Sequence, residues 1–226
     1  MISVLSAIWL SVKLASLTTI FLLLISLPLG WWLAKTRSRI KPAIDAIVTL
    51  PLILPPTVLG YYLLVIFSPQ NRVGKIWGSL FDSTLVFSFS GLLIASIIYS
   101  LPFVVQPIRD GFSMLQADLL DAAKCAGANR WQQFRDVVFP LTRHSILTAA
   151  IMGFAHTVGE FGVVLLIGGN IPGETRVLSI ALYDFVETSQ LDKANAMALG
   201  MLAFSFIVLF SLSYLNHNRF IRVSHR

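Results

Sequence analysis

The chain has 226 residues, of which 56% are hydrophobic and 12% are charged, and its mean hydropathy is +0.77. A soluble domain carries roughly 25% charged residues, so the composition excludes an ordinary soluble protein and indicates an all-α protein that crosses a membrane several times. The net charge of +6 does not indicate nucleic-acid binding, because loop cations that set topology explain it. The single cysteine, Cys125, excludes an intrachain disulfide and a cysteine-based metal cluster.

Five apolar segments are long enough to cross a bilayer, since about 20 helical residues span its hydrocarbon core. We expect one transmembrane domain over residues 1–226, with spans at about 7–34, 43–67, 85–108, 145–168 and 194–216 and a polar loop at about 109–144. The first segment lacks the basic start and the short apolar core of a cleavable signal peptide, so we expect it to be retained.

The distribution of Lys and Arg predicts the orientation. Twelve of these residues fall between spans one and two, between spans three and four, or in the tail: Lys35, Arg37, Arg39, Lys41, Arg109, Lys124, Arg130, Arg135, Arg143, Arg219, Arg222 and Arg226. Four lie on the other side: Arg72, Lys75, Arg176 and Lys193. Because cytoplasmic loops carry the excess of basic residues, we expect the N-terminus outside and the C-terminus in the cytoplasm.

The second span contains three prolines within six residues, Pro51, Pro55 and Pro56. Each removes a backbone donor and clashes with the preceding turn, so this helix is expected to be kinked or locally unwound. Unwound backbone at membrane depth persists where it is buried in protein or faces a cavity. The prolines therefore indicate a segment that lines or gates a path through the membrane. The alternative is a structural kink that fits the packing of the helices.

The fourth span carries His156, Gly159, Glu160 and Gly162. His156 and Glu160 are four residues apart, so we expect them to share a helix face. An ionisable group in a membrane is costly and faces a bundle interior or water. We consider three roles for Glu160: a place at the path or its gate, a structural hydrogen bond with His156 as partner, and metal or proton chemistry. One His and one Glu form an incomplete site for the third.

A Gly- and Pro-containing loop, Gly168–Thr175, follows the fourth span. Its spacing fits G-x-x-x-x-G-x-T, but Glu174 stands where a phosphate-binding loop has lysine, and the preceding segment is a membrane helix rather than a strand. We exclude an ATP site here and expect a loop that ends the span.

The loop at 109–144 predicts two short helices on the cytoplasmic face. Leu115–Cys125 has helix-forming composition, and Gly127 is expected to stop this helix in a left-handed conformation. A second helix, Arg130–Phe139, is expected to end at Pro140. The first helix would present a small surface for close approach, formed by Leu119, Leu120, Ala122 and Ala123; an ordinary interfacial helical hairpin is the alternative.

This segment resembles the EAA loop of ABC-importer permeases, Glu-Ala-Ala-x3-Gly-x9-Ile-x-Leu-Pro. Ala122, Ala123, Gly127 and Pro140 match, whereas Asp121, Val137 and Phe139 replace Glu, Ile and Leu. The resemblance implies the type I ABC importer permease fold, with the first helix docking in a groove of a separate ATPase. The residues expected to carry this coupling are Leu119, Leu120, Asp121, Ala122, Ala123, Gly127 and Pro140.

Three further segments, Leu50–Tyr61, Gly159–Gly162 and Gly169–Arg176, are similar to molybdate permeases. Sulfate and thiosulfate permeases share the Gly-Glu-aromatic-Gly and Asn-Ile-Pro elements, but they are expected to diverge after that proline, so the Gly-Glu-Thr-Arg continuation favours molybdate. Tungstate, a tetrahedral dianion of nearly equal size, is not separated from molybdate. A secondary transporter is disfavoured because no inverted repeat is visible, and a membrane enzyme because no nucleophile–base pair or complete metal site appears.

The family implies partners as well. These are a second copy of the chain, two cytoplasmic ABC ATPase subunits that use ATP and Mg, an external oxyanion-binding protein and the lipid of a bacterial-type inner membrane. The chain itself would bind no cofactor or metal and carry no catalytic residue. The expected path or gate residues are Pro51, Pro55, Pro56, Gly159, Glu160 and Gly162. The expected contacts with the binding protein are Asn170, Pro172, Gly173, Glu174 and Arg176.

Overall fold

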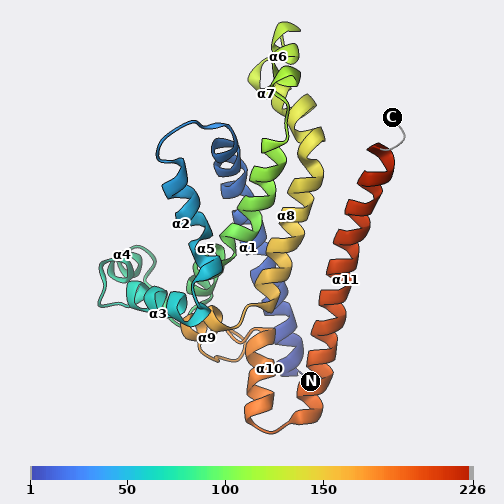
Figure 1. Ribbon diagram of the computed structural model, residues 1–226. Coiled ribbons are helices and arrows are strands. Elements are labelled where there is room, and N and C mark those ends of the chain that lie inside the picture. The colour runs from blue at the N-terminus through green and yellow to red at the C-terminus, as the bar shows by residue number, and fades with distance from the viewer. Residues whose placement is uncertain (1, 224–226) are drawn as a thin grey trace.

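The computed structural model describes residues 2–223, and all regular secondary structure in that range is helical (Figure 1). The elements are α1 (Ile2–Lys35), α2 (Lys41–Ile53), α3 (Pro56–Phe67), α4 (Arg72–Phe81), α5 (Phe89–Ser113), α6 (Ala117–Cys125), α7 (Arg130–Gln133), the π-helical turn η1 (Phe134–Val138), α8 (Phe139–Gly159), α9 (Gly162–Gly168), α10 (Leu178–Glu187) and α11 (Leu191–Val223).

The centre of the molecule is a bundle in which α1, α5 and α8 pack against one another (Figure 1). Its core is a cluster of buried side chains that includes Leu22, Val104, Ile108 and Phe112. A Cβ atom on Gly153 of α8 would lie 2.5 Å from Val104 Cγ2, so only glycine allows these two helices to approach so closely. Small residues at such contacts are typical of helices packed in a membrane.

The prediction of about five membrane spans is confirmed. Four helical segments are long and apolar enough to cross a bilayer: Val4–Lys35, Phe89–Ser113, Arg130–Gly159 and Leu191–Tyr214. A fifth is formed if α2 and α3, which meet at an angle of 112°, are taken as one broken span. Helix α1 begins at the end of the bundle where α10 lies, and α11 finishes at the end where α6 and α7 project (Figure 1).

The kink predicted from the prolines is confirmed by the break between α2 and α3. Leu54 has an extended backbone with ψ of 134°, and Pro56 opens α3 at a position where a missing amide costs no helical hydrogen bond. Pro51 lies inside α2 and is buried. After the break, α3 and α4 turn away from the long axis of the bundle (Figure 1).

The fourth predicted span differs from the structure at both ends. The segments α7, η1 and α8 form one helical stretch, Arg130–Gly159, so the expectation that a helix ends at Pro140 was wrong. In η1 the amide of Phe139 donates to the carbonyl of Phe134, five residues earlier, and this wider π-helical turn directly ahead of Pro140 accommodates the proline ring and its missing amide within the continuous stretch. At the other end the helix stops at Gly159, and α9 begins only at Gly162.

Candidate functional site

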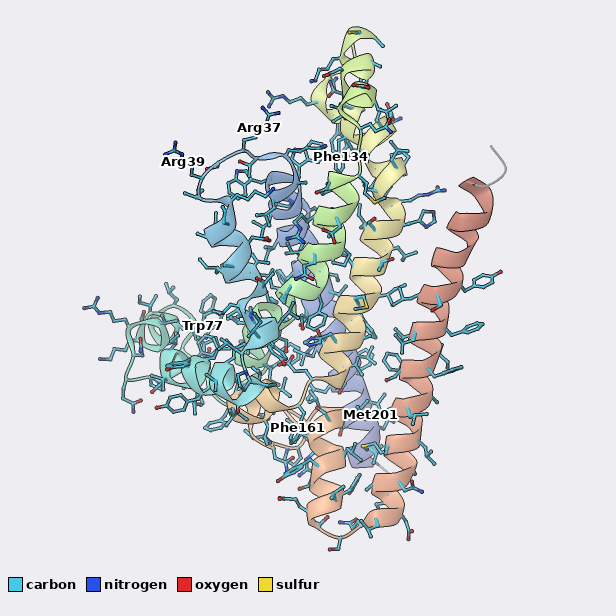
Figure 2. The ribbon with its side chains drawn as sticks, in the orientation of Figure 1. Arg37, Arg39, Trp77, Phe134, Phe161 and Met201 are labelled. Atoms are coloured by element: carbon cyan, nitrogen blue, oxygen red, sulfur yellow. The ribbon has the colours of Figure 1, made fainter. Side chains whose placement is uncertain are left out.

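A groove of about 550 Å³ lies where the two helix breaks meet. It is lined by Pro56, Thr57, Tyr99, Ala155, His156, Gly159, Glu160, Phe161 and Gly162. Helices α3 and α9 each follow a break, and they pack against each other. Figure 2 shows Phe161 in the connection between α8 and α9. The structure therefore brings together four residues of the predicted path or gate, Pro56, Gly159, Glu160 and Gly162.

The other two predicted path residues do not line this groove. Pro51 is buried within α2, and Pro55 is exposed immediately before α3. Sequence reasoning missed Tyr99 and Thr57, whose hydroxyl-bearing side chains face the same space. Nothing in their local sequence sets them apart from ordinary bundle residues.

Contact between the two breaks depends on a glycine. A Cβ atom on Gly162 would lie 2.7 Å from Pro56 Cβ, which is well inside the usual contact distance of about 3.5–4.0 Å between carbon atoms. A Cβ atom on Gly159, three residues earlier, would have nothing within 4 Å. The two glycines of the Gly-Glu-Phe-Gly element thus have different roles: Gly162 permits the helices to touch, and Gly159 borders open groove.

Glu160 ends α8 with an extended backbone, ψ of 133°, and its backbone carbonyl accepts a hydrogen bond from the Ser179 hydroxyl of α10. Only 4% of the residue is exposed. Within the described part of the chain, neither carboxyl oxygen has a partner at hydrogen-bond distance, and the nearby Ser96 hydroxyl is likewise without one. A buried carboxyl without partners is costly and is found where function requires it.

His156 has partners other than the one expected. Its Nδ1 lies 2.9 Å from Ser100 Oγ, and its ring stacks on Phe103 with centroids 3.8 Å apart. His156 and Glu160 line the same groove, but the hydrogen bond considered between them is not formed. Across residues 2–223, no group of three or more His, Cys, Asp or Glu side chains is placed to hold a metal ion.

The α6–α7 segment forms the tip of the molecule (Figure 1). Helix α6 ends in a Schellman motif: the Gly127 amide donates to the Lys124 carbonyl, and the Ala128 amide donates to the Ala123 carbonyl. Gly127 has φ of +82°, which confirms the left-handed conformation predicted for it. Asn129 then caps α7 and forms a reciprocal pair of hydrogen bonds with Gln132.

This tip presents an unpartnered surface. No residue of α6 is buried, and Leu119 is exposed, whereas Leu120 packs on the core beside Phe112. Asp121 forms an ion pair of 2.7 Å with Lys124 on the same helix, and Ala122 and Pro140 are exposed. Met114 and Leu141, two exposed apolar side chains, line a hollow with Leu119. Sequence reasoning missed both, although large apolar residues in an otherwise polar loop could have identified them.

At the opposite end, the loop between α9 and α10 is held by its own polar groups. Asn170 donates to Asp184 Oδ1 at 2.9 Å and accepts from Arg176 Nε, and Arg176 lies 3.7 Å from the same carboxylate. Pro172, Gly173 and Glu174 are exposed in this loop. Of the predicted binding-protein contacts, Asn170 and Arg176 therefore also shape the loop, while the other three form its outer surface.

The comparisons with known proteins agree with this architecture. Residues 26–223 match the family described as binding-protein-dependent transport system inner membrane component. The chain is 53% identical to the molybdenum transport system permease protein ModB of Azotobacter vinelandii, over 92% of both chains. It is 35% identical to the probable sulfate transport system permease protein cysT of Marchantia polymorpha, over 93% of this chain and 73% of the relative.

Among solved structures, a chain of a bacterial alginate ABC transporter in complex with an alginate pentasaccharide-bound periplasmic protein has the same fold. The TM-score is 0.72 at 18% identity, and the match covers 94% of this chain and 77% of that one. The helix order, the projecting α6–α7 tip and the match over nearly the whole sequence lead to one conclusion: the chain belongs to the family of binding-protein-dependent transport system inner membrane components.

Proposed function

We propose that this chain is the membrane-spanning permease subunit of an ATP-driven importer that translocates molybdate delivered by an external binding protein. The observation that carries the proposal is the 53% identity to a molybdenum transport permease across 92% of the chain. The sulfate relative is 35% identical over a similar length, so sulfate is the less supported substrate. Tungstate shares the charge and shape of molybdate and would follow the same route.

ATP hydrolysis would take place in two separate cytoplasmic subunits. Helix α6 fits the docking element because it projects from the bundle and leaves Leu119 and Ala122 exposed for close approach. The rigid Schellman turn at Gly127 fixes the angle between α6 and α7, so a force applied to α6 reaches η1 and α8 without being absorbed by a loose connection. Closure of the ATPase subunits would then rock the membrane helices as rigid bodies.

The path would lie between two copies of the chain, since one bundle of about five spans is too thin to enclose it. The groove at the helix breaks would face this path, and Pro56, Gly159, Glu160 and Gly162, which line it, would form the gate. Glu160 offers a dianion no positive charge, which favours a gating role over substrate ligation. No Arg or Lys lines the groove, so oxyanion selectivity would reside chiefly in the external binding protein.

The test is elemental analysis of a strain that lacks this chain, grown on scarce molybdate with sulfate as the sulfur source. We expect cellular molybdenum to fall and to be restored by excess molybdate, while sulfur stays unchanged. Normal molybdenum with failure to grow on sulfate would transfer the assignment to sulfate. If neither element changes, complementation of a strain whose own molybdenum permease has been deleted decides between redundancy and a wrong substrate.

A further inference from the structure

A second hollow, of about 550 Å³, lies between the last turns of α1 and the α6–η1 segment. Its interior is apolar and includes Leu27, Pro28, Trp31 and Phe134, while the long cationic side chains of Lys124 and Arg130 also line it. Figure 2 shows Phe134 at this end of the bundle, together with Arg37 and Arg39. The hollow is separate from the groove at the helix breaks, with which it shares no lining residue.

The charges around this hollow are predominantly positive. Lys124 forms an ion pair with Asp121, but for Arg130 the described residues offer no carboxylate within ion-pair distance. A third cation, Lys35, lies with its Nζ 5.7 Å from the centre of the Trp31 ring and donates to the Leu115 carbonyl. An uncompensated cation beside an apolar cavity fits a ligand that has an anionic head and an apolar tail.

We propose that this hollow binds an anionic phospholipid of the leaflet facing α6. The headgroup phosphate would contact Lys124 and Arg130, and an acyl chain would extend along Leu27, Pro28 and Trp31. Basic pockets between membrane helices on the cytoplasmic side are suited to such headgroups. The charge distribution of the loops predicts that this end of the bundle faces the cytoplasm.

Depth favours a lipid over a docked protein. Leu27 lies eight residues before Lys35 on α1, which corresponds to roughly 12 Å along the helix axis at 1.5 Å per residue. Leu27 and Trp31 belong to the stretch Val4–Lys35, which is long and apolar enough to cross a bilayer, so this wall of the hollow is part of a membrane span and not of a cytoplasmic loop. An acyl chain lying along this wall would fill the space between α1 and α6, no residue of which is buried.

Trp31 makes the proposal measurable, because lipids brominated on an acyl chain quench tryptophan fluorescence at short range. The full-length chain would be placed in phosphatidylcholine nanodiscs that contain increasing fractions of brominated phosphatidylglycerol or brominated phosphatidylcholine. The difference between the unmodified chain and Trp31→Phe isolates the Trp31 signal from that of the other tryptophans. We expect half-maximal quenching at a much lower fraction of phosphatidylglycerol than of phosphatidylcholine.

The test variant is Lys124→Gln with Arg130→Gln, and the matched control is Arg37→Gln with Arg39→Gln, which removes the same charge at the same end but outside the hollow. Losing two basic residues should weaken selective binding of phosphatidylglycerol by about 30-fold, and the control should change it little. Equal quenching by the two lipids would overturn the proposal. Equal weakening of phosphatidylglycerol binding in both variants would also overturn it. Loss of quenching when the ATPase subunit is added would do the same, because it would assign the hollow to that subunit.

Discussion

The contact between the two helix breaks can be tested by replacing Gly162 with alanine. The new Cβ atom would lie 2.7 Å from Pro56 Cβ, and the proline ring cannot rotate away. Restoring an ordinary carbon–carbon distance of about 3.5–4.0 Å requires the start of α9 and the start of α3 to separate by roughly 1 Å. Overpacking of this kind costs about 1–3 kcal/mol.

Gly159→Ala is the matched control in the same four-residue element. Its Cβ atom would have nothing within 4 Å, and Gly159 is the last residue of α8, where alanine is favoured over glycine by up to about 1 kcal/mol. For a chain of this size, 1 kcal/mol corresponds to roughly 2–4 °C in Tm. We therefore expect Gly162→Ala to lower Tm by roughly 2–12 °C and Gly159→Ala to leave it unchanged or slightly raised.

Thermal unfolding of both variants in the same detergent, followed by tryptophan fluorescence, measures the difference directly. A second readout is uptake, which should fall in Gly162→Ala because the proposed gate consists of the segments that the alanine pushes apart. An unchanged Tm for Gly162→Ala would refute the close contact between α3 and α9. An equal loss in Gly159→Ala would show that any side chain in this element is harmful, and the steric argument would fail.

Three further predictions concern other parts of the chain. Gly127→Trp should abolish co-purification with the proposed ATPase subunit. Gly127→Ala bears the same backbone strain at φ of +82° but should still co-purify. If both variants lose the ATPase, the cause is a distorted turn and not a blocked docking surface. Arg109→Gln should cost about 1 kcal/mol through its half-exposed ion pair with Asp45, at 2.6 Å, and a double-mutant cycle with Asp45→Asn should recover that coupling in Tm. The Glu187 carboxylate accepts a hydrogen bond from the Tyr183 hydroxyl and raises the pKa of Tyr183. Glu187→Gln should therefore lower that pKa, and in absorbance titrations the contribution of one tyrosine should move to lower pH.

The two helix breaks show how far sequence reasoning reaches. The break after Ile53 was predictable because Pro55 and Pro56 cannot continue a helix, whatever surrounds them. The break at Glu160 was not, because the segment is apolar on both sides and contains no proline. It depends on packing of α9 against α3 and on the Ser179 hydroxyl, and Ser179 lies 19 residues away in sequence.

The α6–Gly127–α7 segment was predictable for the opposite reason, since its helix stop and its cap are local signals. The end of the second helix was mispredicted at Pro140 because the π-helical turn ahead of it leaves no mark in the sequence. Helix α4 was missed altogether, although Asn71 caps it through its side chain and the segment that follows is amphipathic. Short helices outside the membrane spans are hidden by the much stronger hydropathy signal of the spans themselves.

The placement of the breaks follows from the requirement that backbone groups at membrane depth find partners within the protein. At the first break the Leu54 amide still donates to the Leu50 carbonyl, and proline removes the donors that would otherwise be unpaired. At the second break the Glu160 carbonyl has left its helix, and the Ser179 hydroxyl replaces the lost donor. The Glu160 carbonyl thus has a partner, whereas neither oxygen of the buried Glu160 carboxyl has one at hydrogen-bond distance among residues 2–223. A buried carboxyl that folding leaves without a close partner is the kind of group that membrane proteins keep at functional positions, and this is the physical reason for expecting Glu160 to act at the gate.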